Sequence, residues 1–234
     1  MSQRRRKIVR NAKYPFRVDA GHVVVDVGGV KVLLDTGAQV SFGRVPALTF
    51  MGETHRLSQK CLGHFTMAEL IEGLRRNTPV SPTLEFDVLL GLDILAGRTL
   101  SLDWVGNVLT VEGPGTGFGT TKDGPLPGTT TVGIGGAQLD AFIDTGAWRT
   151  YLVPEGAEGM VRTGTFQDYN PIFGAIEPDL VEVDVDFQGH RAPLAIGVAT
   201  SELARAIRGV GAKVLIGTDI LIPMGKTVME IPAK

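Results

Sequence analysis

The chain has 234 residues, of which 43% are hydrophobic and 21% charged, the composition of an ordinary folded globular protein. Its 31 glycines, 13 prolines and 6% aromatic residues favour turns and short strands over long helices. The net charge of −2 argues against a nucleic-acid partner, and no apolar run reaches the length of a membrane span.

The N-terminus carries the basic cluster Arg4-Arg5-Arg6-Lys7, and no apolar segment follows it, so we predict no signal peptide. The single cysteine, Cys61, excludes an internal disulfide. We therefore expect a cytoplasmic protein with no membrane partner.

The first clear element is a β-hairpin in residues 22–34. A β-branched run at 22–27 is stopped by Gly28-Gly29 and resumes at 30–34, and a Gly-Gly pair between two such runs predicts a tight hairpin turn. The second strand of this hairpin leads directly into Asp35.

The next stretch contains the one clear helix of the first half. Residues 67–76 place apolar side chains on one helical face, and Thr66 with Glu69 has the spacing of a capping box. A strand is predicted at 86–90, and Asp93 is then expected to cap a short helix. Residues 99–102 and 108–111 predict a further hairpin.

Residues 113–128 are dominated by glycine and proline without periodicity, which is typical of a linker. A phosphate-binding loop would need a strand before it and a helix after it, and neither is indicated. We therefore predict an N-terminal lobe at 1–113, a linker at 114–128 and a C-terminal lobe at 129–234.

The second half repeats this plan. A hairpin around Gly135-Gly136 leads into Asp144, and a strictly alternating strand at 180–187 returns through 192–198. A short helix is predicted at 201–208 and a closing strand at 227–231.

Two segments of the halves match most closely. Asp35-Thr36-Gly37-Ala38 recurs as Asp144-Thr145-Gly146-Ala147 after 109 positions, and residues 88–95 match 214–221 at six of eight positions. A hydroxyl residue follows each motif, Ser41 in one case and Thr150 in the other. Such self-similarity predicts two like-folded, β-rich lobes.

A pseudo-two-fold arrangement of the lobes would bring Asp35 and Asp144 together. Two neighbouring carboxyl groups cannot both ionise easily, so the pair would share one proton and could activate a water molecule for attack on an amide. Thr36 and Thr145 are expected to form hydrogen bonds across the interface. Gly37 and Gly146 are expected to allow tight turns with a close approach of the backbone. A single Asp-Thr-Gly would more often be a plain turn, but a matched pair with matched second segments favours the catalytic interpretation.

The two Asp-Thr-Gly-Ala motifs, each with a later apolar-Gly strand, resemble those of the aspartic peptidases, the clan of retropepsins and pepsins. The alanine after glycine resembles retropepsins more, and the chain looks like a single-chain, internally duplicated retropepsin-like protease of bacterial type. The resemblance implies an all-β, mainly antiparallel, bilobal acid-protease fold. It also implies an aspartic endopeptidase with Asp35 and Asp144 as the catalytic pair, supported by Thr36, Gly37, Thr145 and Gly146.

The resemblance further implies a peptide or protein substrate, no cofactor, and a monomer in which the two lobes pair. Members of this clan close the site with a β-hairpin flap, and we expect one flap only, at 161–178, with Gly164, Tyr169 and Gly174 near its bend. Ala38, Ala147 and Tyr169 are the expected substrate contacts. A peptide-binding or scaffold protein without activity is the alternative function.

A metal site is not expected. His55, Cys61 and His64 have irregular spacing and no fourth partner, so they do not form the pattern of a zinc site.

Overall fold

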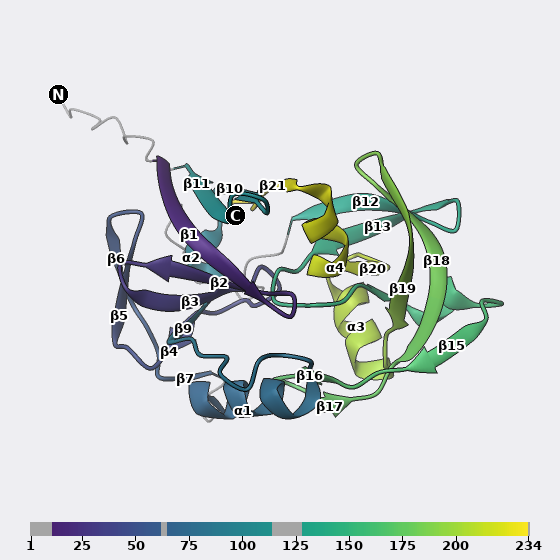
Figure 1. The fold of residues 1–234 in the computed structure, drawn as a ribbon, viewed down its shortest axis with the longest axis horizontal. Helices are drawn as coiled ribbons and strands as arrows, with labels where there is room; N and C mark the ends of the chain where they lie inside the picture. The colour runs from purple at the N-terminus through teal and green to yellow at the C-terminus, as the bar shows by residue number, and fades with distance from the viewer. Residues whose placement is uncertain (1–10, 62–64, 114–127, 234) are drawn as a thin grey trace.

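The computed structural model describes residues 11–61, 65–113 and 128–233. The basic N-terminal cluster, His64 and almost all of the expected linker lie outside these residues. The fold is mainly antiparallel all-β and has two lobes, as predicted (Figure 1). The first lobe is built on one sheet and the second lobe on another.

The first sheet has the strand order β21-β10-β11-β1-β2-β3-β9-β4. Its strands are β1 (Asn11–Asp19), β2 (His22–Val27), β3 (Val30–Leu34), β4 (Phe42–Gly43), β9 (Val88–Leu90), β10 (Thr99–Asp103), β11 (Val108–Glu112) and β21 (Lys226–Glu230). The predicted hairpin is confirmed: Gly28 and Gly29 have φ values of 63° and 87°, the left-handed region that its tight turn requires.

The last strand of the chain belongs to the first sheet. β21 pairs antiparallel with β10, with Leu100 opposite Met229, so the C-terminus returns to the lobe in which the chain began. The predicted closing strand is therefore present, and its hydrogen bonds tie the two lobes together.

The second sheet has the order β12-β13-β20-β14-β19-β18-β15. Its strands are β12 (Thr129–Ile134), β13 (Ala137–Ile143), β14 (Tyr151–Leu152), β15 (Arg162–Thr165), β18 (Asp179–Phe187), β19 (His190–Val198) and β20 (Val214–Ile216). The alternating sequence of β18 buries every second residue, including Val181, Val183 and Val185, as its pattern predicted.

Three small hairpins complete the strands in the described residues: β5 (Ala47–Phe50) with β6 (Glu53–Arg56), β7 (Lys60–Cys61) with β8 (Phe65–Thr66), and β16 (Asp168–Asn170) with β17 (Gly174–Ile176). The β5–β6 hairpin packs on the outer part of the first lobe, where Phe50 stacks on Tyr14. The β16–β17 hairpin extends instead from the second lobe toward the first (Figure 1).

The helices are α1 (Met67–Asn77), α2 (Leu92–Leu95), α3 (Ser201–Gly209) and α4 (Thr218–Leu221), with 3-10 turns at Pro154–Ala157 and Ile222–Met224. The predicted capping box begins α1: the Thr66 hydroxyl accepts from the Glu69 amide, and the Glu69 carboxylate accepts from the Thr66 amide. The prediction that Asp93 caps a short helix is wrong, because α2 begins after Gly91 and has no side-chain cap.

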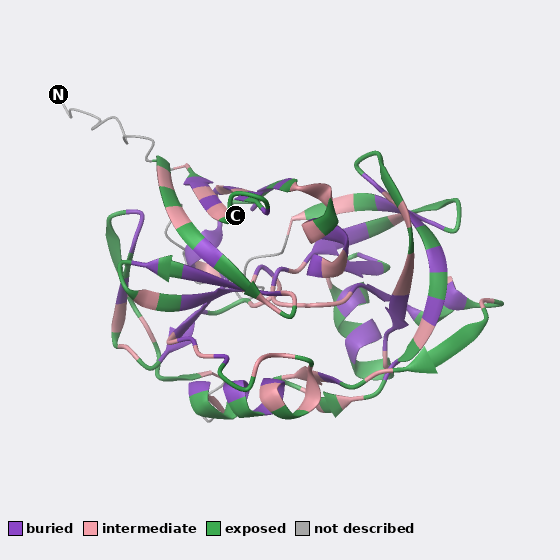
Figure 2. Ribbon diagram, in the orientation of Figure 1, coloured by how far each residue is buried: buried purple, intermediate pink, exposed green. Residues whose placement is uncertain are grey.

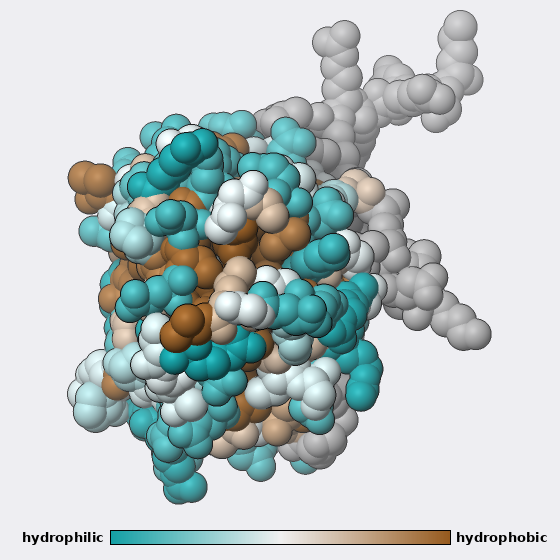
Figure 3. All heavy atoms as spheres, turned by 90° about the vertical axis from the view of Figure 1, so that its right-hand side faces the viewer, coloured by the Kyte–Doolittle hydropathy of each residue, from teal (hydrophilic) through white to brown (hydrophobic). Residues whose placement is uncertain are grey.

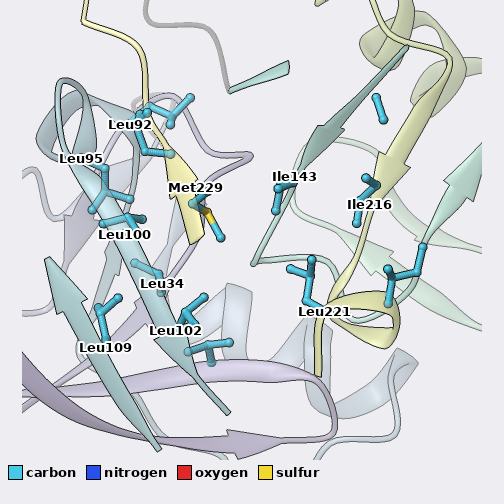
Figure 4. Packing of buried hydrophobic residues seen from close by; sticks show 14 of the residues in the cluster. Leu34, Leu92, Leu95, Leu100, Leu102, Leu109, Ile143, Ile216, Leu221 and Met229 are labelled. Carbon is cyan, nitrogen blue, oxygen red and sulfur yellow. The ribbon is translucent and has the colours of Figure 1, made fainter. Parts of the chain in front are cut away.

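Buried aliphatic residues form a core that is continuous through both lobes. Figure 4 shows Met229 of β21 among the leucines of the first lobe, while Ile143 and Ile216 lie together in the second. A helix covers the face of each sheet that points away from this core. In the first lobe α1 packs on Leu33 and Leu89, and in the second lobe α3 packs on the equivalent Phe142 and Leu215. In Figure 2 these helices are buried on one side and exposed on the other.

The outer face of the second lobe mixes hydrophilic residues with hydrophobic ones, and the hydrophobic residues gather toward the middle of this face (Figure 3). Within residues 11–61, 65–113 and 128–233, no helix has the length and apolar character needed to cross a membrane.

Candidate active site

The two aspartates stand at equivalent points of the two sheets. Asp35 follows β3, which pairs parallel with β9, and Asp144 follows β13, which pairs parallel with β20. The Asp35 amide donates to the Leu90 carbonyl at 3.1 Å, and the Asp144 amide donates to the Ile216 carbonyl at 2.9 Å. The strands of the second matched segments therefore fix the start of both turns.

The ends of the turns are fixed in the same way. The carbonyl of Ala38 accepts from the Leu92 amide at 2.8 Å, and the carbonyl of Ala147 accepts from the Thr218 amide at 2.9 Å. The two alanines, expected as substrate contacts, thus use their carbonyl groups to hold the turns.

Close to each turn, a hydroxyl residue forms hydrogen bonds with a second aspartate. Asp93 accepts from both the amide and the hydroxyl of Ser41, and Asp219 accepts from both groups of Thr150. This contact is the real role of Asp93. Both hydroxyl residues stand six positions after an Asp-Thr-Gly aspartate, and this matched spacing is the signal that could have predicted the contact.

The threonines join the lobes by reciprocal hydrogen bonds, as expected. The Thr36 hydroxyl accepts from the Thr145 amide at 3.0 Å and donates to the Ile143 carbonyl at 2.9 Å. The Thr145 hydroxyl accepts from the Thr36 amide at 3.2 Å and donates to the Leu34 carbonyl at 2.9 Å. Both threonine side chains are fully buried, so these bonds are shielded from competing water.

The glycines allow each aspartate to lie against the opposite turn. A Cβ at Gly37 would be 2.2 Å from the Oδ2 atom of Asp144, and a Cβ at Gly146 would be 2.4 Å from the Cγ atom of Asp35. Each glycine amide also donates to the aspartate of its own turn, at 3.0 Å and 2.8 Å. Any larger residue at either position would push the two carboxyl groups apart.

The carboxyl pair is electrostatically asymmetric. Burial and the negative charge of Asp144 raise the pKa of Asp35 well above its usual value. Burial also raises the pKa of Asp144, but hydrogen bonds from the Gly146 amide and from the Asp35 carboxyl group oppose this rise. The two carboxyl groups therefore titrate as one coupled pair, in which the pKa of Asp35 is raised more strongly than that of Asp144.

A buried histidine lies beside the second turn. The His22 ring is near the Gly146 backbone, and within the described residues neither ring nitrogen has a hydrogen-bond partner. Burial lowers the pKa of His22 to about 4, against the opposing effects of Asp19 and the Gly146 backbone. Nothing in the sequence around His22 marks it, because its neighbourhood is created by contact between the lobes.

The expected flap region contains a hairpin, but its details differ from the prediction. Tyr169 lies in β16, and Gly174, with φ of 80°, begins β17 after the bend. Gly164 is not near the bend: it lies in β15, which pairs with β18 at the edge of the second sheet. Tyr169 does not stand free above the aspartates, because its ring packs on Gly73 of α1.

Hairpin side chains lie in the clusters that adjoin both turns. Tyr169 and Ala38 belong to the apolar cluster around α1, while Ile176 and Ala147 belong to the cluster around α3. The hairpin therefore packs against an apolar cluster of each lobe, and each of these clusters also contacts the alanine of an aspartate turn.

The described residues contain no group of three or more histidine, cysteine or acidic side chains arranged to hold a metal ion.

Comparison with known proteins gives a limited likeness. No family model and no curated protein matches the chain. Among solved structures, it is similar to the protease of simian foamy virus (mac), with 21% identity, a TM-score of 0.30, and coverage of 41% of this chain and 94% of the viral one. It is also similar to the retroviral protease-like domain of Ddi1 from Leishmania major, with 20% identity, a TM-score of 0.28, and coverage of 44% and 74%.

Proposed function

We propose that the protein is an aspartic endopeptidase in which Asp35 and Asp144 together activate water. The observation that carries this proposal is the facing pair of carboxyl groups, held by the reciprocal bonds of Thr36 and Thr145. Two carboxyl groups with separated pKa values are the arrangement that acid–base catalysis by one proton-sharing pair requires.

In the proposed reaction, ionised Asp144 takes a proton from the water molecule, and the water oxygen attacks the carbonyl carbon of the peptide bond. Protonated Asp35 gives its proton to the carbonyl oxygen, which forms a neutral tetrahedral intermediate. The intermediate then collapses: Asp144 returns its proton to the leaving nitrogen and the C–N bond breaks, while Asp35 takes back a hydroxyl proton. Supporting roles fall to Gly37 and Gly146, whose amides orient the carboxylates.

We propose that the chain is a covalent duplicate, with lobes at 1–113 and 129–234 and a linker at 114–128, except that β21 near the end of the second range joins the sheet of the first lobe. The matched hydrogen bonds of the two turns support this division. A monomer would then supply both aspartates, as two subunits do in retropepsins. Return of β21 to the first sheet would help to keep the lobes together. A cytoplasmic location remains part of the proposal.

The β16–β17 hairpin is proposed as the flap. An extended peptide substrate would add its backbone to this hairpin and place alternate side chains toward the two lobes. Tyr169, Ala38 and Ala147 are the proposed substrate neighbours.

A peptide-binding protein that does not cleave is the second candidate. It is favoured by the contact between Tyr169 and α1, since a hairpin held in this way could retain a peptide rather than release products. Against it, a binder has no need for two buried carboxyl groups whose pKa values are raised at a cost in stability.

The test is incubation with a diverse peptide library, with and without a transition-state-mimicking inhibitor of aspartic peptidases. Asp35→Asn and Asp144→Asn should each abolish cleavage, and Asp184→Asn, the same change at an exposed position of β18, should have no effect. Cleavage that survives both site variants, made separately, would exclude the proposed dyad. Tight binding of an intact peptide without turnover from pH 3 to 8 would favour the second candidate.

A further inference from the structure

Asp168 is a buried acid that the proposed chemistry does not use. It is the first residue of β16 and is only 7% exposed. Burial raises the pKa of Asp168 above its usual value, while hydrogen bonds from its neighbours and the charge of Arg149 oppose this rise. A buried carboxylate needs hydrogen-bond donors to offset the loss of hydration.

Three donors surround this carboxylate. Its Oδ1 atom accepts from the Trp148 indole at 2.9 Å and from the Tyr169 amide at 2.7 Å, and its Oδ2 atom accepts from the Tyr151 hydroxyl. A carboxylate can accept from all three donors at once, two on Oδ1 and one on Oδ2.

Two of the donors come from the segment that carries the second catalytic aspartate. Trp148 and Tyr151 stand four and seven residues after Asp144, and Tyr151 begins β14. The guanidinium of Arg149 lies over the faces of the Trp148 and Phe166 rings, 4.6 Å and 4.8 Å from their centroids, so the indole contacts Arg149 through its face and Asp168 through its N–H group. Asp168 therefore links the first strand of the hairpin to the loop beyond Asp144.

The next residue of the hairpin is held by the opposite lobe. A Cβ at Gly73 would be 2.1 Å from the Cζ atom of Tyr169, so the tyrosine ring occupies the space that the missing side chain leaves on α1. Successive residues of a strand point to opposite sides. Asp168 consequently faces the second lobe while Tyr169 faces the first.

We propose that Asp168 is a positioning residue that holds the β16–β17 hairpin in register with the Asp144 loop, so that Tyr169 meets α1 at Gly73 and the hairpin covers the substrate. This inference rests on the proposed peptidase function for its kinetic consequence. The placement of the hairpin itself does not depend on any activity.

The test compares Asp168→Asn with Asp184→Asn in the full chain. The three donors use both carboxylate oxygens of Asp168 in the wild type, whereas asparagine has one acceptor oxygen. The variant therefore loses one hydrogen bond to a charged acceptor. We expect hydrogen exchange of the β16–β17 amides to accelerate about ten- to hundredfold, the range for loss of one such bond, while exchange in β18 and β19 is unchanged. KM for a cleaved peptide should rise by a similar factor with little change in kcat, because the dyad is intact. Asp184→Asn should match the wild type in every measurement.

Two further variants keep the test decisive. Tyr151→Phe removes one donor and keeps the ring, so it should give a smaller change of the same kind and should add little to Asp168→Asn. If Asp168→Asn does not fold, Tyr151→Phe alone decides. Unchanged hairpin exchange and unchanged KM, with only a lower Tm, would overturn the positioning role. If the wild type cleaves no peptide, the proposed function fails, yet hydrogen exchange and the affinity for a non-cleavable inhibitor still test Asp168.

Discussion

Thr36→Val offers the most direct test of how the two lobes are joined. Valine has nearly the shape of threonine but lacks the hydroxyl group. The change removes the acceptor of the Thr145 amide and the donor to the Ile143 carbonyl, both in a fully buried position. The neighbouring hydroxyl of Thr145 lies 3.4 Å away and already donates to Leu34, so it cannot replace both bonds.

The expected cost follows from the groups left without partners. An orphaned buried amide costs about 1–3 kcal/mol, and a carbonyl that loses one of its partners costs about 1 kcal/mol. We therefore expect Thr36→Val to lower the free energy of unfolding by about 2–4 kcal/mol, a large share of the ~5–15 kcal/mol that is typical of a folded domain. Thr36→Ser keeps the hydroxyl and should cost about 1 kcal/mol, for one lost buried methyl group.

Urea unfolding followed by tryptophan fluorescence measures this cost, and each lobe contributes one of the two tryptophans: Trp104 follows β10 and Trp148 follows the second aspartate turn. Thr49→Val is the matched control, since its hydroxyl bonds only to exposed Thr54, and it should change stability by less than about 0.5 kcal/mol. The reasoning is refuted if Thr36→Val costs no more than Thr49→Val or Thr36→Ser.

Three further predictions concern titration. Because the pKa of His22 falls from 6.5 to about 4 on folding, the unfolded chain binds the His22 proton more tightly, and the free energy of unfolding should fall by roughly 3 kcal/mol as pH drops from 6.5 to 4. His22→Leu should remove this part of the pH dependence of the urea midpoint, and an unchanged pH dependence would contradict the prediction. The raised pKa of Asp35 has the opposite effect, because its contribution to stability is lost as pH rises above 3.8. Asp35→Asn should therefore be more stable than the wild type at pH 7 but not at pH 3, and a less stable variant at pH 7 would refute the prediction. Ala38→Ser adds a hydroxyl donor beside the carboxyl pair and should move the pH optimum of peptide cleavage down; an upward shift would contradict the reasoning.

The sequence predicted the parts of the fold that are determined by local signals. Gly28-Gly29 required a tight turn, and the alternation in residues 180–187 required a half-buried strand, so both elements were correct. The capping box at Thr66 also identified the start of α1. The repeated motif indicated which two carboxyl groups would meet, although not how the turns are braced.

The errors and omissions come from contacts between distant segments. Asp93 has the residue type of a helix cap, but its carboxylate is used by Ser41, 52 positions earlier. The strands at 47–56 lack clear alternation and form a hairpin because Leu48 and Phe50 pack on the first lobe. Asp168 and His22 carry no local signal at all, since their surroundings exist only after the lobes pack.

The surroundings of the two aspartates share more than the prediction of a single flap implied. The helices α1 and α3 cover equivalent faces of the two sheets, since Leu33 and Phe42 in one cluster stand 109 positions before Phe142 and Tyr151 in the other. The asymmetry that bears on the site is the β16–β17 hairpin.

This asymmetry needs two complementary features, and each lobe supplies one. The second lobe provides the hairpin with Tyr169, and the first provides the bare backbone of Gly73 that receives it. Gly73→Ala separates these features, because alanine is the better helix former by about 1 kcal/mol while its Cβ must displace the ring. If α1 has only a structural role, this variant is simply more stable. If α1 receives the hairpin, Gly73→Ala should accelerate hydrogen exchange in β16 and β17. In a chain that already carries Tyr169→Ala, the same substitution should have no such effect.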